Sequence, residues 1–149
     1  MIIEEIRDIE LLIRIRFDFF AAIGHPVGDD KEEMTASLRN YFNRHIDHDF
    51  IALALKEKDT IISSGYLIIN EIPANRNALS GLTGTLLNLF TYPEYQGCGH
   101  AANLIEAFKK EALNRNLSFI DLYATEQGIP LYRKTGFEPI SYQAMRLKL

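Results

Sequence analysis

The chain has 149 residues, of which 47% are hydrophobic and 24% charged, and its net charge is −4 at pH 7. This composition is typical of a globular protein and excludes a disordered or collagen-like chain. The length fits a single domain over residues 1–149. The acidic balance excludes general nucleic-acid binding, which needs a concentrated basic surface. The one cysteine, Cys98, excludes an intrachain disulfide framework and a zinc site built from several cysteines.

No stretch approaches the roughly 20 apolar residues of a membrane span, so no membrane partner is expected. Residues 1–5 lack the basic and then apolar pattern of a signal peptide. A lone cysteine is compatible with a reducing compartment. We therefore expect a cytoplasmic protein.

The N-terminal part of the chain predicts helices. Residues 2–6 fit either a short strand or an early helical turn. Apolar residues at helical spacing predict a helix over residues 8–22, with Asp8 as its N-cap and Gly24 after its end.

A second helix is expected over residues 30–46, where an apolar residue recurs at every fourth position. Asp30 and Glu33 have the spacing of a capping box, with aspartate in place of the usual serine or threonine.

The middle of the chain changes to the pattern of strands. Residues 50–55 form an apolar run that ends at a polar turn over 56–59, and an isoleucine-rich strand follows over 60–70, which together predict an antiparallel hairpin. Residues 71–81 contain proline, glycine and polar side chains and are expected to form a loop. A third strand is predicted over 82–91.

The C-terminal part alternates between the two patterns. A helix is predicted from near Gly97–Gly99 to residue 114, a short strand over 118–123, a short helix over 125–135, and final strand material over 137–149. This order of elements predicts an α+β or α/β domain, in which helices pack on a mixed sheet.

The turn between the strand at 82–91 and the next helix contains Gly97 and Gly99. A helix N-terminus has unpaired N–H groups and a partial positive charge, and glycines leave room for a phosphate to approach them. The alternative is that the two glycines only shape the turn. The turn lacks the third glycine of the dinucleotide fingerprint and the lysine of a Walker loop, so neither pattern supports NAD or ATP binding.

Two motifs in the C-terminal half resemble the GNAT N-acetyltransferase superfamily. Gln96-x-x-Gly99-x-Ala101 is similar to the superfamily's pyrophosphate motif, [RQ]-x-x-G-x-[GA], and Leu131–Phe137 is similar to its L-Y-x-K-x-G-F element. The resemblance covers about residues 6–149. It implies a mostly antiparallel mixed sheet flanked by helices, an acyl-CoA N-acyltransferase fold, and acetyl-CoA as the cosubstrate without a metal.

The resemblance also implies roles for particular residues. Backbone N–H groups of the loop would bind the pyrophosphate, and the end of the preceding strand would bind the pantetheine arm as an added strand does. The residues that these two roles assign to coenzyme binding are Leu89, Phe90, Thr91, Gln96, Gly97, Cys98, Gly99, His100 and Ala101. Thr125 falls where the family often has a polar residue near the coenzyme, and it fits equally well as a helix N-cap.

Tyr132 matches the tyrosine that many family members use as a general acid. In the implied reaction, an amine attacks the thioester, a tetrahedral intermediate forms, and coenzyme A leaves as a thiolate. A phenol with a pKa of about 10 stays protonated at neutral pH and can protonate that sulfur. The alternative role for Tyr132 is packing on an amphipathic helix.

No general base is evident in the sequence. The matching strand has Asn88, which cannot act as a base; it either binds substrate or lies at an exposed strand edge. Glu71 and Glu94 flank the expected cleft, and we assign neither as the base. Cys98 has no identifiable partner for covalent catalysis, and we expect His100 at the surface.

The histidines at positions 45 and 48 alternate with aspartates at a helix-to-strand turn, which favours a solvated turn over a metal site.

The resemblance leaves two function classes open. One is an N-acetyltransferase acting on a primary amine of a small molecule or peptide; the other is a non-catalytic acyl-CoA-binding or regulatory module. A nucleotide-binding protein of another fold would instead prefer ATP or NAD. The resemblance does not identify the acceptor, whose pocket would be built from the first two helices and the loop at 71–81. Many family members dimerise, so a homodimer is one expectation.

Overall fold

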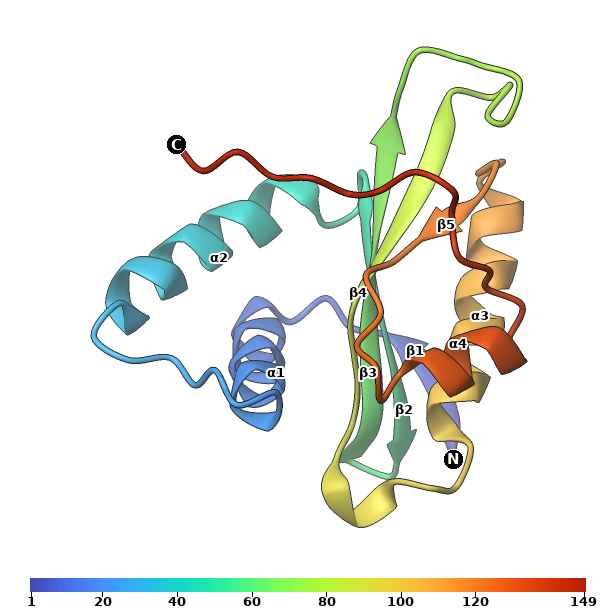
Figure 1. Cartoon of the computed structure of the whole chain (residues 1–149). Helices are drawn as coiled ribbons and strands as arrows, with labels where there is room; N and C mark the ends of the chain where they lie inside the picture. The colour runs from blue at the N-terminus through green and yellow to red at the C-terminus, as the bar shows by residue number, and fades with distance from the viewer.

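The computed structural model describes residues 1–149 and contains one five-stranded sheet in the order β1-β2-β3-β4-β5. Neighbouring strands run antiparallel except β4 and β5, which are parallel. Helices α1 and α2 lie on one face of the sheet, and α3 and α4 lie on the other (Figure 1). The mixed, mostly antiparallel sheet flanked by helices is confirmed. The elements are β1 (Ile2–Glu5), α1 (Ile9–Ala22), α2 (Lys31–His45), β2 (Phe50–Glu57), β3 (Thr60–Glu71), β4 (Leu82–Thr91), a 3₁₀ turn η1 (Pro93–Tyr95), α3 (His100–Asn114), β5 (Ile120–Asp121) and α4 (Ile129–Lys134).

The two N-terminal helices begin in different ways. The Asp8 carboxylate accepts a hydrogen bond from the Leu11 N–H at 3.1 Å, so Asp8 caps α1 as predicted. The capping box predicted for α2 is absent: Asp30 is the N-cap residue, but its carboxylate accepts from the Gly28 N–H at 3.3 Å instead. Its side chain therefore stabilises the preceding turn and leaves the first turn of α2 without a side-chain cap.

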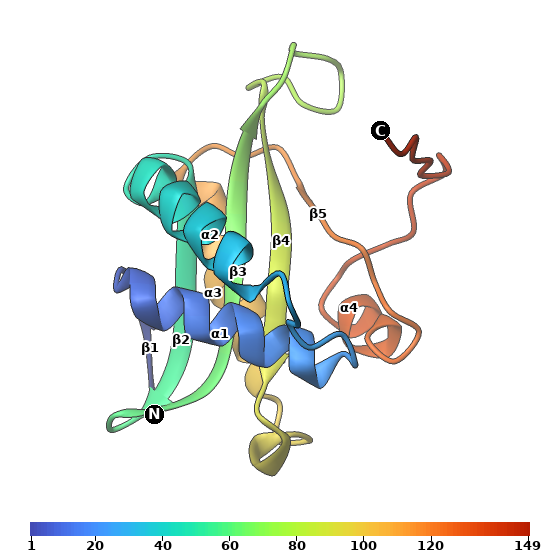
Figure 2. The same ribbon diagram turned by 90° about the vertical axis from the view of Figure 1, so that its left-hand side faces the viewer.

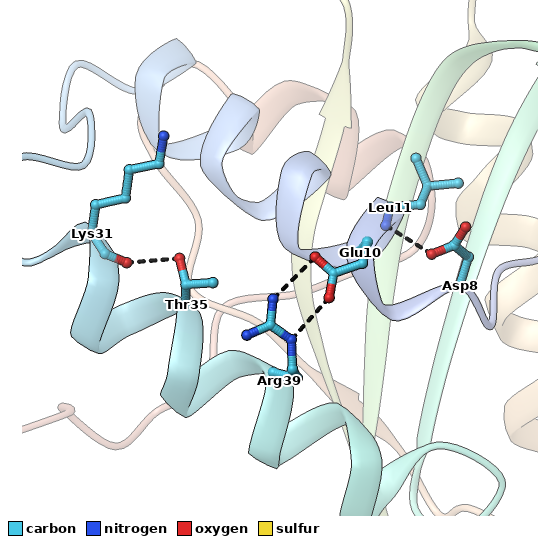
Figure 3. A network of polar contacts seen from close by, with 6 residues as sticks. All are labelled: Asp8, Glu10, Leu11, Lys31, Thr35 and Arg39. Carbon is cyan, nitrogen blue, oxygen red and sulfur yellow. Dashed lines mark hydrogen bonds and ion pairs between the residues drawn. The ribbon is translucent and has the colours of Figure 1, made fainter.

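One exposed ion pair joins α1 to α2 (Figure 3). The Arg39 guanidinium on α2 donates to both carboxylate oxygens of Glu10 on α1, at 2.9 and 3.1 Å. This bidentate contact lowers the pKa of Glu10. It links two helices that Figure 2 shows lying in front of the sheet.

The sheet has a hydrophobic cluster on each face, and β2 contributes to both because its side chains alternate. The first cluster lies under α3, where Leu104, Ile105 and Phe108 are buried against β2, β3 and β4. The second lies under α1 and α2 and is rich in aromatic rings. Its buried aromatic members are Phe42, Phe50 and Tyr66.

Replacing Phe108 by alanine is expected to lower the free energy of unfolding by about 3–5 kcal/mol, because the ring is fully buried at the centre of the α3 cluster. Denaturant unfolding measures this change. Leu113→Ala on the same helix is the matched control, because Leu113 is 77% exposed and its loss should change stability by no more than about 0.5 kcal/mol. Equal losses in the two variants would contradict the placement of this core.

The C-terminal elements are smaller than the sequence predicts. The strand expected over 118–123 is limited to Ile120–Asp121, and the helix expected over 125–135 is limited to Ile129–Lys134. The strand material predicted over 137–149 is wrong, since these residues form no strand. Alternation alone does not make a strand, because a strand needs a neighbour to pair with. Here β5 pairs with only two residues of β4, and the side chains of Met145, Leu147 and Leu149 are exposed.

Candidate functional site

One edge of β4 is paired with β5 over only part of its length. Its pairing with β5 comprises Gly84 with Ile120 and Thr85 with Asp121, and no strand pairs with that edge of β4 from residue 86 onward. The residues that the resemblance assigns to the pantetheine arm, Leu89, Phe90 and Thr91, lie in this part of β4. Backbone groups on such an edge are available to an extended ligand.

A β-bulge interrupts β4 at Asn88. The register between β3 and β4 shifts between Ser64 and Tyr66, and Asn88 has a φ of +56°, a conformation that asparagine tolerates better than most residues. The bulge directs the Asn88 side chain toward α1, where its amide oxygen accepts from the Arg16 guanidinium at 3.0 Å. Asn88 is only 4% exposed, so the expectation of an exposed strand edge is wrong.

Three side chains fix the end of β4. The Ser63 hydroxyl donates to the Phe90 carbonyl at 2.9 Å, and the Gln96 side-chain amide donates to the Thr91 carbonyl at 3.0 Å. The Tyr92 hydroxyl donates to Asp18 on α1 at 2.6 Å, and burial together with this hydrogen bond raises the pKa of Tyr92. The start of the glycine-containing loop is therefore attached both to the sheet and to α1.

The loop after η1 presents a run of free backbone donors. Gly97 and Gly99 have φ values of +78° and +81°, the left-handed conformation that favours glycine. Asn103 makes the first intrahelical hydrogen bond of α3, to the Gly99 carbonyl. The backbone N–H groups that donate to no protein acceptor are those of Gly97, Cys98, Gly99, His100, Ala101 and Ala102.

This run differs by one residue at each end from the set expected from sequence. The Gln96 N–H donates to the Pro93 carbonyl at 3.3 Å and is not free. The Ala102 N–H is free, and the sequence reasoning missed it. The general rule that the first turn of a helix lacks partners for its N–H groups could have identified it.

The surroundings of the run suit an anion. Apart from the glycine itself and its two chain neighbours, no protein atom lies within 4 Å of the position that a Cβ would take at Gly97 or Gly99, so both positions are open. The N-terminus of α3 adds the positive end of a helix dipole. Cys98, within this loop, is exposed. His100 is 9% exposed and its Nδ1 has no partner, so the expectation of a surface histidine is wrong.

Tyr132 lies on α4 and packs against the α3 cluster, as Leu89 of β4 and Tyr95 of η1 also do. Its ring meets the Phe137 ring edge to face, with centroids 5.7 Å apart. A Cβ at Gly128 would come within 2.8 Å of the Tyr132 ring, so a glycine one turn earlier makes room for it. Burial raises the pKa of the Tyr132 phenol.

Thr125 stabilises the turn that precedes α4. Its hydroxyl accepts from the Gly128 N–H at 3.2 Å, and its carbonyl accepts from the N–H groups of Gly128 and Ile129. The predicted N-cap role is wrong, because α4 begins at Ile129 and Gly128 is its N-cap residue.

The remaining polar candidates lie outside this arrangement. Glu71 and Glu94 are both exposed. His45 and Asp49 contact each other through Nδ1 and a carboxylate oxygen at 2.6 Å, and no group of three histidine, cysteine or acidic side chains is arranged to hold a metal. None of the helices combines the length and the apolar character needed to cross a bilayer.

Comparisons with known proteins place this arrangement in context. Residues 47–139 match the family model of the acetyltransferase (GNAT) domain, a range that includes β2 to α4 and the glycine-containing loop. The chain has no significant match among curated proteins.

Solved structures resemble the chain over nearly its whole length. A predicted acetyltransferase from Clostridium acetobutylicum, crystallised with acetyl-CoA, is 26% identical with a TM-score of 0.84, and the match covers 99% of this chain and 96% of that one. A GCN5-related N-acetyltransferase from Ralstonia eutropha is 23% identical with a TM-score of 0.82, covering 98% and 97%. A Trypanosoma brucei acetyltransferase is 19% identical with a TM-score of 0.72, covering 99% of each chain.

Proposed function

The chain belongs to the GNAT acetyltransferase family, and from this premise we propose that it transfers the acetyl group of acetyl-CoA to a primary amine of a small molecule or peptide. The observation that carries the proposal is the run of unpaired N–H groups from Gly97 to Ala102, which overlaps the family's motif at Gln96–Ala101. A similar protein at 26% identity was crystallised with acetyl-CoA, which supports the same coenzyme here.

The loop fits the diphosphate of coenzyme A on physical grounds. A diphosphate offers several acceptor oxygens with negative charge, and the run offers successive donors beside the positive end of α3. The two glycines leave the approach open because they have no side chains. The residues that would hold this group are therefore those from Gly97 to Ala102, through their backbones.

The free edge of β4 fits the pantetheine arm, which carries amide groups. From residue 86 to the end of β4, the edge that β5 leaves is not paired with another strand. An extended arm there can pair with the backbone of residues 89–91. Leu89 also contacts the α3 cluster, against which Tyr132 packs.

In this proposal Tyr132 is the general acid. Acetyl-CoA supplies the thioester that the amine attacks, and coenzyme A departs as a thiolate. The Tyr132 phenol gives its proton to that sulfur, and the raised pKa keeps this proton in place at neutral pH. The proton that the attacking amine loses passes to solvent water, and neither exposed glutamate, Glu71 or Glu94, is assigned as the base.

Release of free coenzyme A thiol tests the proposed reaction. Purified protein is incubated with acetyl-CoA and a broad panel of primary amines, and the thiol is followed with a chromogenic disulfide. We expect release that depends on the amine, with an acetylated product identified by mass spectrometry. Thiol release without an amine measures plain hydrolysis and is the control. If folded protein that binds acetyl-CoA acetylates no amine in the panel, the non-catalytic acyl-CoA-binding module is the better account.

A further inference from the structure

Arg16 on α1 is a half-buried cation without a counter-ion. Its guanidinium makes one hydrogen bond, from Nη1 to the Asn88 amide oxygen at 3.0 Å. No carboxylate lies within ion-pair distance of it, whereas exposed Arg39 is paired with Glu10. Burial lowers the pKa of Arg16. A desolvated charge without a partner is costly, so the arrangement needs a reason.

Aromatic rings hold the Arg16 side chain in one orientation. The guanidinium carbon lies 4.5 Å from the centroid of the Phe20 ring and 5.9 Å from that of the Phe19 ring. Asp18, the acidic residue two positions after Arg16 on α1, accepts a hydrogen bond from the Tyr92 hydroxyl. Most of the guanidinium's donors therefore have no protein acceptor, although the group itself is fixed in place.

Asn88 supplies a second donor at the same point. Its side-chain Nδ2 is buried and donates to nothing, while its oxygen accepts from Arg16. Asn88 lies in the β-bulge, past the last pair between β4 and β5. Unpaired buried donors are uncommon in native proteins, so this amide needs an explanation. The free N–H groups of the adjacent Arg16 guanidinium match the oxygens of a carboxylate or a phosphate.

We propose that Arg16, positioned by Asn88, binds an anionic group, a carboxylate or a phosphate, on the amine that receives the acetyl group. The inference rests on the proposed function for the identity of that molecule as the acceptor. Arg16 binds the anion through its planar fork, and Asn88 holds the guanidinium by accepting a hydrogen bond from its Nη1. The accepted amine then carries its negative group on the α1 side of β4.

Matched pairs of amines test this inference. Each pair has one anionic and one neutral member: alanine with alaninamide for the carboxylate, and 2-aminoethyl phosphate with ethanolamine for the phosphate. We expect kcat/KM for the anionic member of at least one pair to exceed that of the neutral member by about 10-fold or more. Which pair shows the preference distinguishes a carboxylate acceptor from a phosphate acceptor.

Substitutions at Arg16 assign the preference to this residue. In Arg16→Met the ratio should fall close to one, while the Kd for acetyl-CoA stays unchanged, which also shows that the variant is folded. Arg16→Lys keeps the charge without the planar fork and should retain part of the preference. Arg14→Met is the matched control, because Arg14 is an exposed arginine on the same helix and its loss should leave the ratio unchanged.

A binding readout separates this inference from the proposed reaction. The shift of the thermal unfolding midpoint is measured with each amine, in the wild type and in Arg16→Met. An Arg16-dependent shift by the anionic members without any acetylation would contradict the proposed reaction and support the anion site. No preference for the anionic members in either readout would overturn the anion site. A loss of acetyl-CoA affinity in an Arg16→Met protein that still unfolds cooperatively on heating would also overturn it, because the anion would then belong to the coenzyme.

Discussion

Replacing Gly99 by valine is expected to weaken acetyl-CoA binding by about 100-fold, because a side chain at this position blocks the approach to the free N–H groups. Loss of two charge-assisted hydrogen bonds of about 1.5 kcal/mol each gives this factor. The residue has a φ of +81° and no neighbour within 4 Å, so the new side chain would occupy the space left for the ligand. Calorimetric titration of wild type and variant with acetyl-CoA measures the change.

Gly24 provides a matched control for the backbone strain of this substitution. Gly24 has a φ of +82°, and its Cβ position is equally open, but it lies at the end of α1 rather than in the loop. A valine in the left-handed conformation costs roughly 1–2 kcal/mol at either site. Gly24→Val should therefore lose similar stability and keep the acetyl-CoA affinity. Unchanged affinity in Gly99→Val would contradict the assignment of the loop.

Replacing Tyr132 by phenylalanine is expected to lower kcat by about 100-fold, since a general acid contributes on the order of 10²–10⁴ in rate. The Kd for acetyl-CoA should not change, because phenylalanine keeps the ring that packs against Phe137. The measurements are single-turnover kinetics with an accepted amine and calorimetric titration of both proteins. Tyr123→Phe is the matched control, because Tyr123 is 79% exposed and its hydroxyl has no assigned role.

The pH dependence of kcat gives Tyr132 a second test. A general acid works only while it is protonated, and burial raises the pKa of Tyr132 above its usual value of about 10. Loss of this proton should therefore not lower the wild-type rate between pH 7 and about 10. A wild-type rate in Tyr132→Phe would show that Tyr132 only packs and that another group protonates the leaving thiolate.

Much of the sheet could be predicted from sequence because its strands are long and strongly patterned. The strand from Leu82 to Thr91 has the predicted bounds, and the helices α1 and α3 begin within a residue or two of the predicted positions. These segments contain enough apolar residues for one period to stand out. The short C-terminal elements could not be predicted in the same way. Strand β5 has only two residues, which is too short to show a periodic pattern of apolar residues. Residues 137–149 have the alternating pattern of a strand but no neighbouring strand to pair with.

Only part of the candidate site could be predicted from the sequence, and again the local part is the predictable one. The loop with Gly97 and Gly99 could be found from sequence because its chemistry is in the backbone and its signal is local. The contact between Arg16 and Asn88 could not be found, because the two residues are 72 positions apart and the β-bulge alone turns Asn88 toward α1. His100 shows the same limit: its position in the chain suggests the surface, and only the packing of α3 shows that it is buried.

Calorimetric titration of the wild-type protein with acetyl-CoA, with coenzyme A, ATP and NAD as comparisons, tests the coenzyme assignment most directly. Binding in the micromolar range to acetyl-CoA and coenzyme A, with much weaker binding of ATP and NAD, is the expected result, because the loop and the free edge of β4 together fit a diphosphate joined to an amide-containing arm. Absence of acetyl-CoA binding in protein that is shown to be folded would contradict the coenzyme site and, with it, the proposed acetyl transfer.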